Sequence, residues 1–162
     1  MNDAPVAVLD TAIVDEDTSL TVDVISNDTD VDVTDTLTLI TAIADGFGTV
    51  SVNADGVSVD YTPAANFNGT ETITYIVSDG TDTSTGTLTI TVTAVNDAPV
   101  AIADTATVLE DSALTNIDIV SNDTDVEGDT LTLIIATPDG SGTATVNASG
   151  VSDEYSPAEN CD

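Results

Sequence analysis

Apolar and polar residues alternate one by one along much of the chain, as in Leu-Thr-Val-Asp-Val over residues 20–24. This period of two places successive side chains on opposite faces of an extended backbone, so each such stretch predicts a β-strand. Turn-forming clusters such as Ala54-Asp55-Gly56 separate the stretches, and no stretch has the spacing of an amphipathic helix. The strands predicted in the first part of the chain cover residues 8–14, 20–24, 37–42, 49–53, 57–61, 72–77 and 86–93.

Short alternating strands with turns at regular intervals are typical of an immunoglobulin-like β-sandwich. The sequence therefore predicts an all-β fold, with a Greek-key sandwich that buries one side chain in two along each strand. The side chains expected to face the core are Leu20, Val22, Val24, Leu37, Leu39, Val50, Val52, Val57, Val59, Tyr61, Ile73, Tyr75, Val77, Leu88, Ile90 and Val92.

The motif Asn-Asp-Ala-Pro-Val occurs at residues 2–6 and again at residues 96–100. A motif that returns after a domain-sized interval indicates tandem copies of one fold, and its proline favours a stiff connector. The sequence predicts a first domain over residues 1–97 and a second over residues 98–162, joined end to end.

The second copy follows the first closely, since Gly142, Gly150 and Tyr155 match Gly48, Gly56 and Tyr61. One extra residue in the second copy predicts a β-bulge near Thr115 and Asn116. The match stops before the last two strands, so the second sandwich is expected to be incomplete. Two explanations stay open: the sequence is part of a longer chain, or another chain supplies those strands.

The charge of the chain limits what it can do, because its formal net charge of −30 comes with no Lys, Arg or His. No internal salt bridge between side chains is possible, and self-repulsion must be offset by cations from solution. The absence of basic residues argues against nucleic acid and against anionic membranes as partners, and no stretch is apolar enough for membrane insertion. Without histidine, and with few aromatic residues to line a cleft, the chain is not expected to be an enzyme.

The acidic residues cluster in loops, which the strand order places at the two ends of each sandwich. At the joint between copies, three groups that are distant in sequence are expected to converge. Oxygen-only ligands of this kind suit Ca²⁺, although Leu39 and Ile134 occupy the positions where an EF-hand loop requires glutamate. The candidate ligands at the joint are Glu16, Asp17, Asn96, Asp97, Asp123, Asp125, Glu127 and Asp129. The corresponding candidates at the other ends are Asp3, Asp28, Asp30, Asp32, Glu110 and Asp111.

Several motifs together resemble the cadherin-like tandem repeats, related to VCBS repeats, of giant bacterial surface adhesins of the RTX type. They are the joint Val-Asn-Asp-Ala-Pro-Val, the Glu-Asp turn, the Asn-Asp-x-Asp loop, Tyr-Thr-Pro before Asn-Phe-Asn-Gly, and Thr-Tyr-Ile-Val-Ser-Asp-Gly. The resemblance implies an extracellular, calcium-stiffened spacer whose partners are neighbouring repeats of the same chain or fibre.

Two other functions stay open at this point. The chain could be the subunit of an extracellular filament, in which strands from a neighbouring molecule complete the second sandwich. It could also be an adhesive module that binds sugar or a host protein through its loops, although few aromatic residues are present to form a sugar platform.

Overall fold

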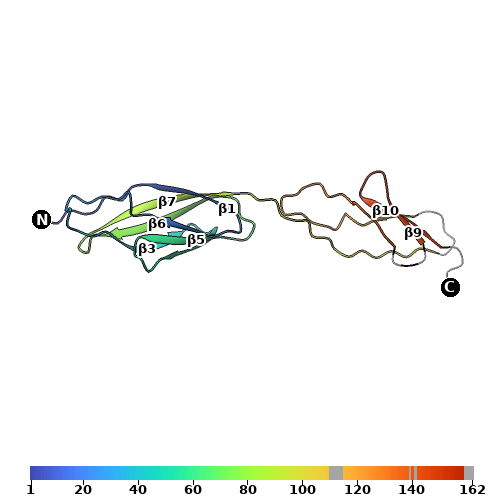
Figure 1. The fold of residues 1–162 in the computed structure, drawn as a ribbon, viewed down its shortest axis with the longest axis horizontal. Coiled ribbons are helices and arrows are strands. Elements are labelled where there is room, and N and C mark those ends of the chain that lie inside the picture. Colours follow the sequence, from blue (N-terminus) through green and yellow to red (C-terminus); the bar gives the residue numbers. More distant parts are fainter. Residues whose placement is uncertain (110–114, 139, 141, 159–162) are drawn as a thin grey trace. The chain divides into compact units, whose positions relative to one another are not determined.

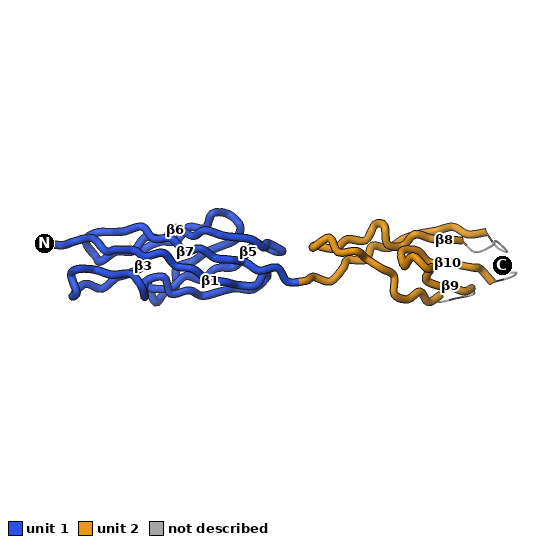
Figure 2. Tube along the Cα trace, turned by 90° about the horizontal axis from the view of Figure 1, so that it is seen from above, with its two compact units in different colours: residues 1–95 blue, residues 96–162 orange. Residues whose placement is uncertain are grey.

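The computed structural model describes residues 1–109, 115–138, 140 and 142–158 of the chain (Figure 1). These residues form two compact units, Met1–Val95 and Asn96–Asp162, which Figure 2 shows in different colours. The sequence predicted a division two residues later, between residues 97 and 98. The described residues contain no helix that is long and apolar enough to cross a membrane.

The first unit is an all-β immunoglobulin-like sandwich, as predicted. One sheet has four strands in the order β1-β7-β6-β3, and the facing sheet has three in the order β2-β5-β4. The non-consecutive neighbours within each sheet give the Greek-key connection. The strands of this unit are β1 (Asp10–Asp15), β2 (Leu20–Asp23), β3 (Thr38–Ala44), β4 (Gly48–Val52), β5 (Ser58–Pro63), β6 (Gly69–Ser78) and β7 (Thr83–Thr93).

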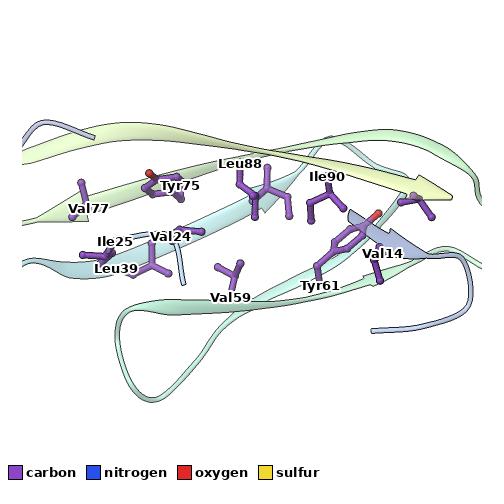
Figure 3. Close-up of a cluster of buried hydrophobic side chains, with 12 residues drawn as sticks. Val14, Val24, Ile25, Leu39, Val59, Tyr61, Tyr75, Val77, Leu88 and Ile90 are labelled. Atoms are coloured by element: carbon purple, nitrogen blue, oxygen red, sulfur yellow. The ribbon is translucent and has the colours of Figure 1, made fainter. Parts of the chain in front are cut away.

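The core lies between the two sheets, where Figure 3 shows aliphatic side chains packed around the rings of Tyr61 and Tyr75. Every side chain that the sequence assigned to the core is buried or partly buried in this cluster, and Val14 and Ile25 join it. Tyr75 packs directly on the backbone of Gly86 in the paired strand β7, where a Cβ atom would lie 2.1 Å from the ring carbon Cζ. Glycine at this position therefore makes room for the buried ring.

Strand β1 runs parallel to β7, from Asp10 opposite Leu88 to Asp15 opposite Thr93. The strand β3 has a register shift between Leu39 and Thr41 where it pairs with β6. The alternating pattern did not predict either feature, because it assigns faces and not partners.

The described residues of the second unit form one three-stranded sheet in the order β8-β10-β9. These strands, β8 (Thr115–Asp118), β9 (Gly142–Val146) and β10 (Ser152–Pro157), correspond to β2, β4 and β5. The residues that correspond to β1 and β3 are not strands in the described part of this unit. In the first unit those two strands pair with β7 and β6, which have no counterpart among the described residues of the second unit.

The predicted β-bulge is not at Thr115 and Asn116. The ladder between β8 and β10 runs without a register shift from Thr115 opposite Tyr155 to Asp118 opposite Ser152. Residues 110–114, which precede β8, lie outside the described part of the chain, so the prediction is not tested there.

Candidate metal-binding ends of the repeats

The start of the first unit is tied to its long acidic loop by hydrogen bonds. The backbone N–H of Asp3 donates to Asp32 Oδ2 over 2.8 Å, and the N–H of Asp32 donates to Asp30 Oδ1 over 2.7 Å. Asn2 Nδ2 donates to Asp79 Oδ2 over 3.0 Å. The second oxygen of Asp30, Oδ2, is buried and has no hydrogen-bond partner among the described residues. One carboxylate oxygen at this end is thus both desolvated and unpaired.

The second unit repeats this arrangement at its own start. The N–H of Asp97 donates to Glu127 Oε2 over 3.1 Å, and Asp125 Oδ1 accepts the N–H groups of Glu127 and Asp129, each over 3.1 Å. The side chain of Asn96 donates to the carbonyl of Asp97 over 2.8 Å. Asp97 Oδ2 is buried without a partner in the described part of the chain. The hydrogen bond from Asp97 to Glu127 is equivalent to the one from Asp3 to Asp32 in the first unit. Both repeats therefore tie the connector to the acidic loop in the same way.

The opposite end of the first unit contains a buried acid, Glu16, which is only 3% exposed. Its backbone N–H donates to the carbonyl of Thr93 over 2.9 Å, and its Oε1 accepts the N–H of Val95 over 2.6 Å. Its Oε2 has no partner among the described residues. The adjacent Asp17 adopts a φ of 57° and accepts the N–H of Asn66 over 3.1 Å. The Glu-Asp turn, the Asn66 loop and the exit strand therefore meet at one end of the first unit.

The donor atoms at these ends suit a hard cation, because they are carboxylate and carbonyl oxygens and three of them are buried and unpaired. However, no group of three or more acidic, histidine or cysteine side chains in the described residues is arranged to hold a metal ion. The described acidic side chains therefore do not form a complete site by themselves. The candidates Glu110 and Asp111 lie outside the described residues, and the convergence of the ligands across the two units stays a prediction.

Asp28 and Asp123 have an internal role that the sequence did not reveal. Asp28 Oδ1 accepts the N–H of Val8 over 2.7 Å, and Asp123 Oδ1 accepts the N–H of Ile102 over 2.8 Å in the second unit. These bonds fix the connector to the acidic loop in each repeat. Asp28 also lies 3.4 Å from the hydroxyl of Tyr75, so its assignment as a metal ligand stays a prediction beside this role.

The hydroxyl of the buried Tyr75 is surrounded by acceptors. It lies 3.0 Å from Asp10 Oδ2 and 3.1 Å from the carbonyl oxygen of Val8, with Asp28 at 3.4 Å. A hydroxyl has one proton to donate, so the two carboxylates compete for it. Asp10 lies in a motif Asp-Thr-Ala that recurs at Asp104 in the second copy.

We expect Asp10 and Asp28 to titrate at higher pH than the exposed Asp55 and Asp79. Burial is the main cause that raises the pKa of Asp10 and of Asp28, whereas hydrogen bonds from Ser58 and Asn2 lower the pKa of Asp55 and Asp79, respectively. NMR titration of the carboxyl carbons measures all four groups in one sample.

The pH dependence of folding stability follows from the raised pKa values of Asp10 and Asp28. A raised folded-state pKa contributes stability below the unfolded-state pKa, and this stability is lost as the pH rises through the folded-state pKa. If Asp10 and Asp28 titrated together with or below Asp55 and Asp79, the Tyr75 cluster would not have the geometry described above.

Glu71 is a fully buried acid in β6, and the alternating sequence pattern does not predict its burial. Its Oε1 accepts the N–H groups of Asp45 and Gly46 over 2.6 and 3.1 Å, and its Oε2 accepts the N–H of Phe47 over 2.8 Å. The hydroxyl of Tyr61 lies 3.3 Å from Oε2, and burial together with this carboxylate raises the pKa of Tyr61 to about 12. Glu71 therefore holds the turn between β3 and β4 by an all-internal network.

Comparison with known proteins identifies one family. The model described as "Bacterial Ig domain" matches residues 2–91 and 96–162, one match for each repeat. None of the curated proteins compared with the chain matches it.

Two solved structures that align with the chain are endo-fucoidan hydrolases of glycoside hydrolase family 107. MfFcnA4 is 20% identical with a TM-score of 0.45, and MfFcnA9 is 15% identical with a TM-score of 0.32. The alignments cover 96% and 98% of this chain, but only 24% and 30% of those proteins. The chain thus spans about a quarter of the length of the solved structures that it matches.

Proposed function

Because the chain belongs to the bacterial Ig domain family, we propose that its sandwiches are spacer repeats of a large extracellular adhesin or surface fibre, stiffened by Ca²⁺ where repeats meet. In this proposal the chain is structural and not catalytic, and its repeats are of the cadherin-like, VCBS-related type. Its partners are the neighbouring repeats of the same chain or fibre.

The observation that carries the proposal is the buried, unpaired Oε2 of Glu16 beside the exit strand of the first unit. A buried carboxylate oxygen without a partner is costly, and the chain has no Lys, Arg or His to pair with it. A cation from solution offsets this cost. Ca²⁺ suits such a place because it accepts six to eight oxygen ligands in irregular geometry, including carbonyls and water.

The second support is that the start of each repeat has a buried, unpaired carboxylate oxygen, at a different position in each: Asp30 Oδ2 in the acidic loop of the first unit and Asp97 Oδ2 in the connector of the second. In this proposal, the end of one repeat contributes Glu16 and Asp17, and the start of the next contributes Asn96, Asp97 and its acidic loop. The acidic side chains of the described residues do not form a complete site, so the proposal also requires backbone carbonyls and water as ligands. Calcium then acts as a joint that forms only between successive repeats.

The proposal also assigns the chain an extracellular location, which suits the same chemistry. Calcium sites of extracellular modules bind with dissociation constants of roughly 10⁻⁴–10⁻³ M, which are filled only where free calcium is abundant. The strongly negative chain also remains soluble there, because dissolved cations screen its self-repulsion.

Calcium titration by calorimetry and small-angle scattering with and without EGTA test the proposal. We expect saturable binding of Ca²⁺ and a narrower range of inter-repeat angles when calcium is present. The variant Glu16→Gln should weaken the binding at least about tenfold, because it removes the charge but keeps an oxygen for the N–H of Val95. The variant Asp60→Asn is the matched control, since it removes one charge from the exposed face of β5.

Identical scattering profiles in calcium and in EGTA would contradict the proposed joint. Equal weakening by Glu16→Gln and by Asp60→Asn would mean that calcium only screens the overall charge and occupies no site at Glu16.

A further inference from the structure

Asn68 is the one asparagine in the sequence that glycine follows. It lies between the turn in which the N–H of Phe67 donates to the carbonyl of Ala64 over 3.1 Å and Gly69, the first residue of β6. Asn68 and Gly69 are both exposed, and the side-chain amide of Asn68 makes no hydrogen bond with any described residue. This amide is therefore open to water and is not fixed by its surroundings.

The fold requires glycine at position 69. Its φ is +137°, a backbone conformation that residues with a Cβ atom rarely adopt. The loop before it is ordered by the rings of Phe47 and Phe67, which stack with their centroids 4.7 Å apart. The entry into β6 thus places a residue without a side chain directly after Asn68, and nothing on that residue shields its backbone nitrogen.

The backbone of Gly69 is also the part of β6 that opens most readily. Gly69 and Val92 form the last pair of the ladder between β6 and β7, and terminal pairs open at a small free-energy cost. When this pair opens, the side-chain carbonyl carbon of Asn68 and the nitrogen of Gly69 are close enough to react, because they belong to adjacent residues.

Asn53 shows the opposite case in the same unit. Its Nδ2 donates to Ser58 Oγ over 2.9 Å and to Asp60 Oδ1 over 3.0 Å, so its amide is held in one orientation. The residue that follows it is Ala54, whose side chain hinders the approach of the backbone nitrogen. Asn53 therefore serves as an internal reference for an asparagine that is protected.

We propose that Asn68 is a site of spontaneous deamidation, for which the chain supplies every group except water. The backbone nitrogen of Gly69 gives up its proton and bonds to the side-chain carbonyl carbon of Asn68. The amide C–N bond breaks, and the amide nitrogen leaves with that proton as ammonia. Water then opens the cyclic imide at either carbonyl carbon. One product is aspartate with a normal backbone, and the other is isoaspartate, in which the backbone runs through the side chain.

The reaction changes the end of the first unit that contains Glu16 and Asp17. Asp17 accepts the N–H of Asn66 over 3.1 Å, so the new carboxylate enters the same loop as an acidic turn. Isoaspartate also inserts one extra atom into the backbone immediately before Gly69, where the ladder with Val92 begins. The inference rests on the loop and the strand entry and does not depend on calcium.

Ageing of the full chain at mildly alkaline pH tests the proposal, and peptide mapping after pepsin digestion locates the change. We expect the peptide that contains Asn68 to gain the mass difference between asparagine and aspartate, while Asn53 stays intact. Anion-exchange chromatography should resolve a product with one additional negative charge. Conversion should be at most about tenfold slower than in a free peptide of residues 64–73, because only one terminal ladder pair has to open.

Two variants separate the reaction from its effect. Asn68→Gln keeps an amide but should yield no new charged form, since its longer side chain would have to close a larger ring. Asn68→Asp has the charge of the product with a normal backbone. The isoaspartyl form of the aged chain should melt roughly 4–8 °C below this variant, because it loses the first ladder pair of β6.

Two results would overturn the proposal: retention of Asn68 after the free peptide has been converted, or conversion of Asn53 at the same rate as Asn68. Equal melting temperatures of the isoaspartyl form and of Asn68→Asp would overturn the assigned effect on β6.

Discussion

Replacing Glu71 with Ala is expected to lower the free energy of unfolding of the first unit by about 3–5 kcal/mol. The change removes the acceptor of three backbone N–H groups, those of Asp45, Gly46 and Phe47. The residues of this turn are exposed, and the N–H of Asp45 also donates to the carbonyl of Thr72 over 3.0 Å, so the lost hydrogen bonds weigh most at Gly46 and Phe47. The loss of the buried side chain also leaves a cavity beside Tyr61. The turn between β3 and β4 should therefore lose its order first.

Urea denaturation followed by circular dichroism measures this effect. Glu71→Gln should destabilise the first unit by a smaller amount, because one oxygen still accepts while the new NH₂ group faces backbone donors. Asp60→Ala, which removes an exposed carboxylate that accepts hydrogen bonds from Thr21 and Asn53, should cost much less stability than Glu71→Ala. A loss below about 1 kcal/mol for Glu71→Ala would show that water satisfies the turn and that the network is dispensable.

The strands and the core of the first unit could be predicted because both follow from local sequence. An alternating pattern fixes which side chains share a face, and burial then selects the apolar face. Val59, Tyr61 and Ile73, for example, follow directly from this rule, and all three are fully buried. Glycine and aspartate at the turns set the strand ends to within a few residues.

The partners of the strands could not be predicted in the same way. The parallel pairing of β1 with β7 joins residues separated by most of the domain, and no local pattern records it. Glu71 occupies an inward position in an alternating strand where the rule expects an apolar side chain. Its role depends on a turn that precedes it by more than twenty residues, as its bond to Asp45 shows. The burial of such a polar group can be explained only when the structure shows where the turn lies relative to the strand.

The acidic ends were predicted in composition but not in detail. The sequence grouped Asp28 and Asp123 with the metal ligands because they are acidic and lie in the same loop as Asp30 and Asp125. The structure shows that Asp28 and Asp123 bond to the connector backbone. Carboxylates of one loop cannot be told apart from sequence alone. Only the hydrogen bonds in the structure distinguish a carboxylate that binds backbone N–H groups from one that has a buried, unpaired oxygen.

Calcium is expected to raise the melting temperature of the chain by roughly 10 °C or more relative to EGTA. A ligand that binds only the folded state adds about 2.7 kcal/mol per site when its free concentration is 100 times the dissociation constant. One kcal/mol corresponds to about 4–8 °C for a domain of 60–100 residues. Relief of the buried, unpaired Oε2 of Glu16 is part of this binding free energy. Differential scanning calorimetry at several calcium concentrations gives the shift directly.

Two comparisons separate a specific site from general screening of the charge. Sodium chloride at matched ionic strength screens the net charge of −30 without occupying a site, so it should reproduce only part of the shift. Mg²⁺ should also fall short of calcium, because it requires a strict octahedral shell and releases its water reluctantly. Glu16→Gln should lose most of the difference between calcium and magnesium, whereas Asp60→Asn should keep it. If sodium chloride or magnesium produced the whole shift, the unpaired oxygen of Glu16 would need no metal, and stiffness at the joint would have to come from the proline-containing connector alone.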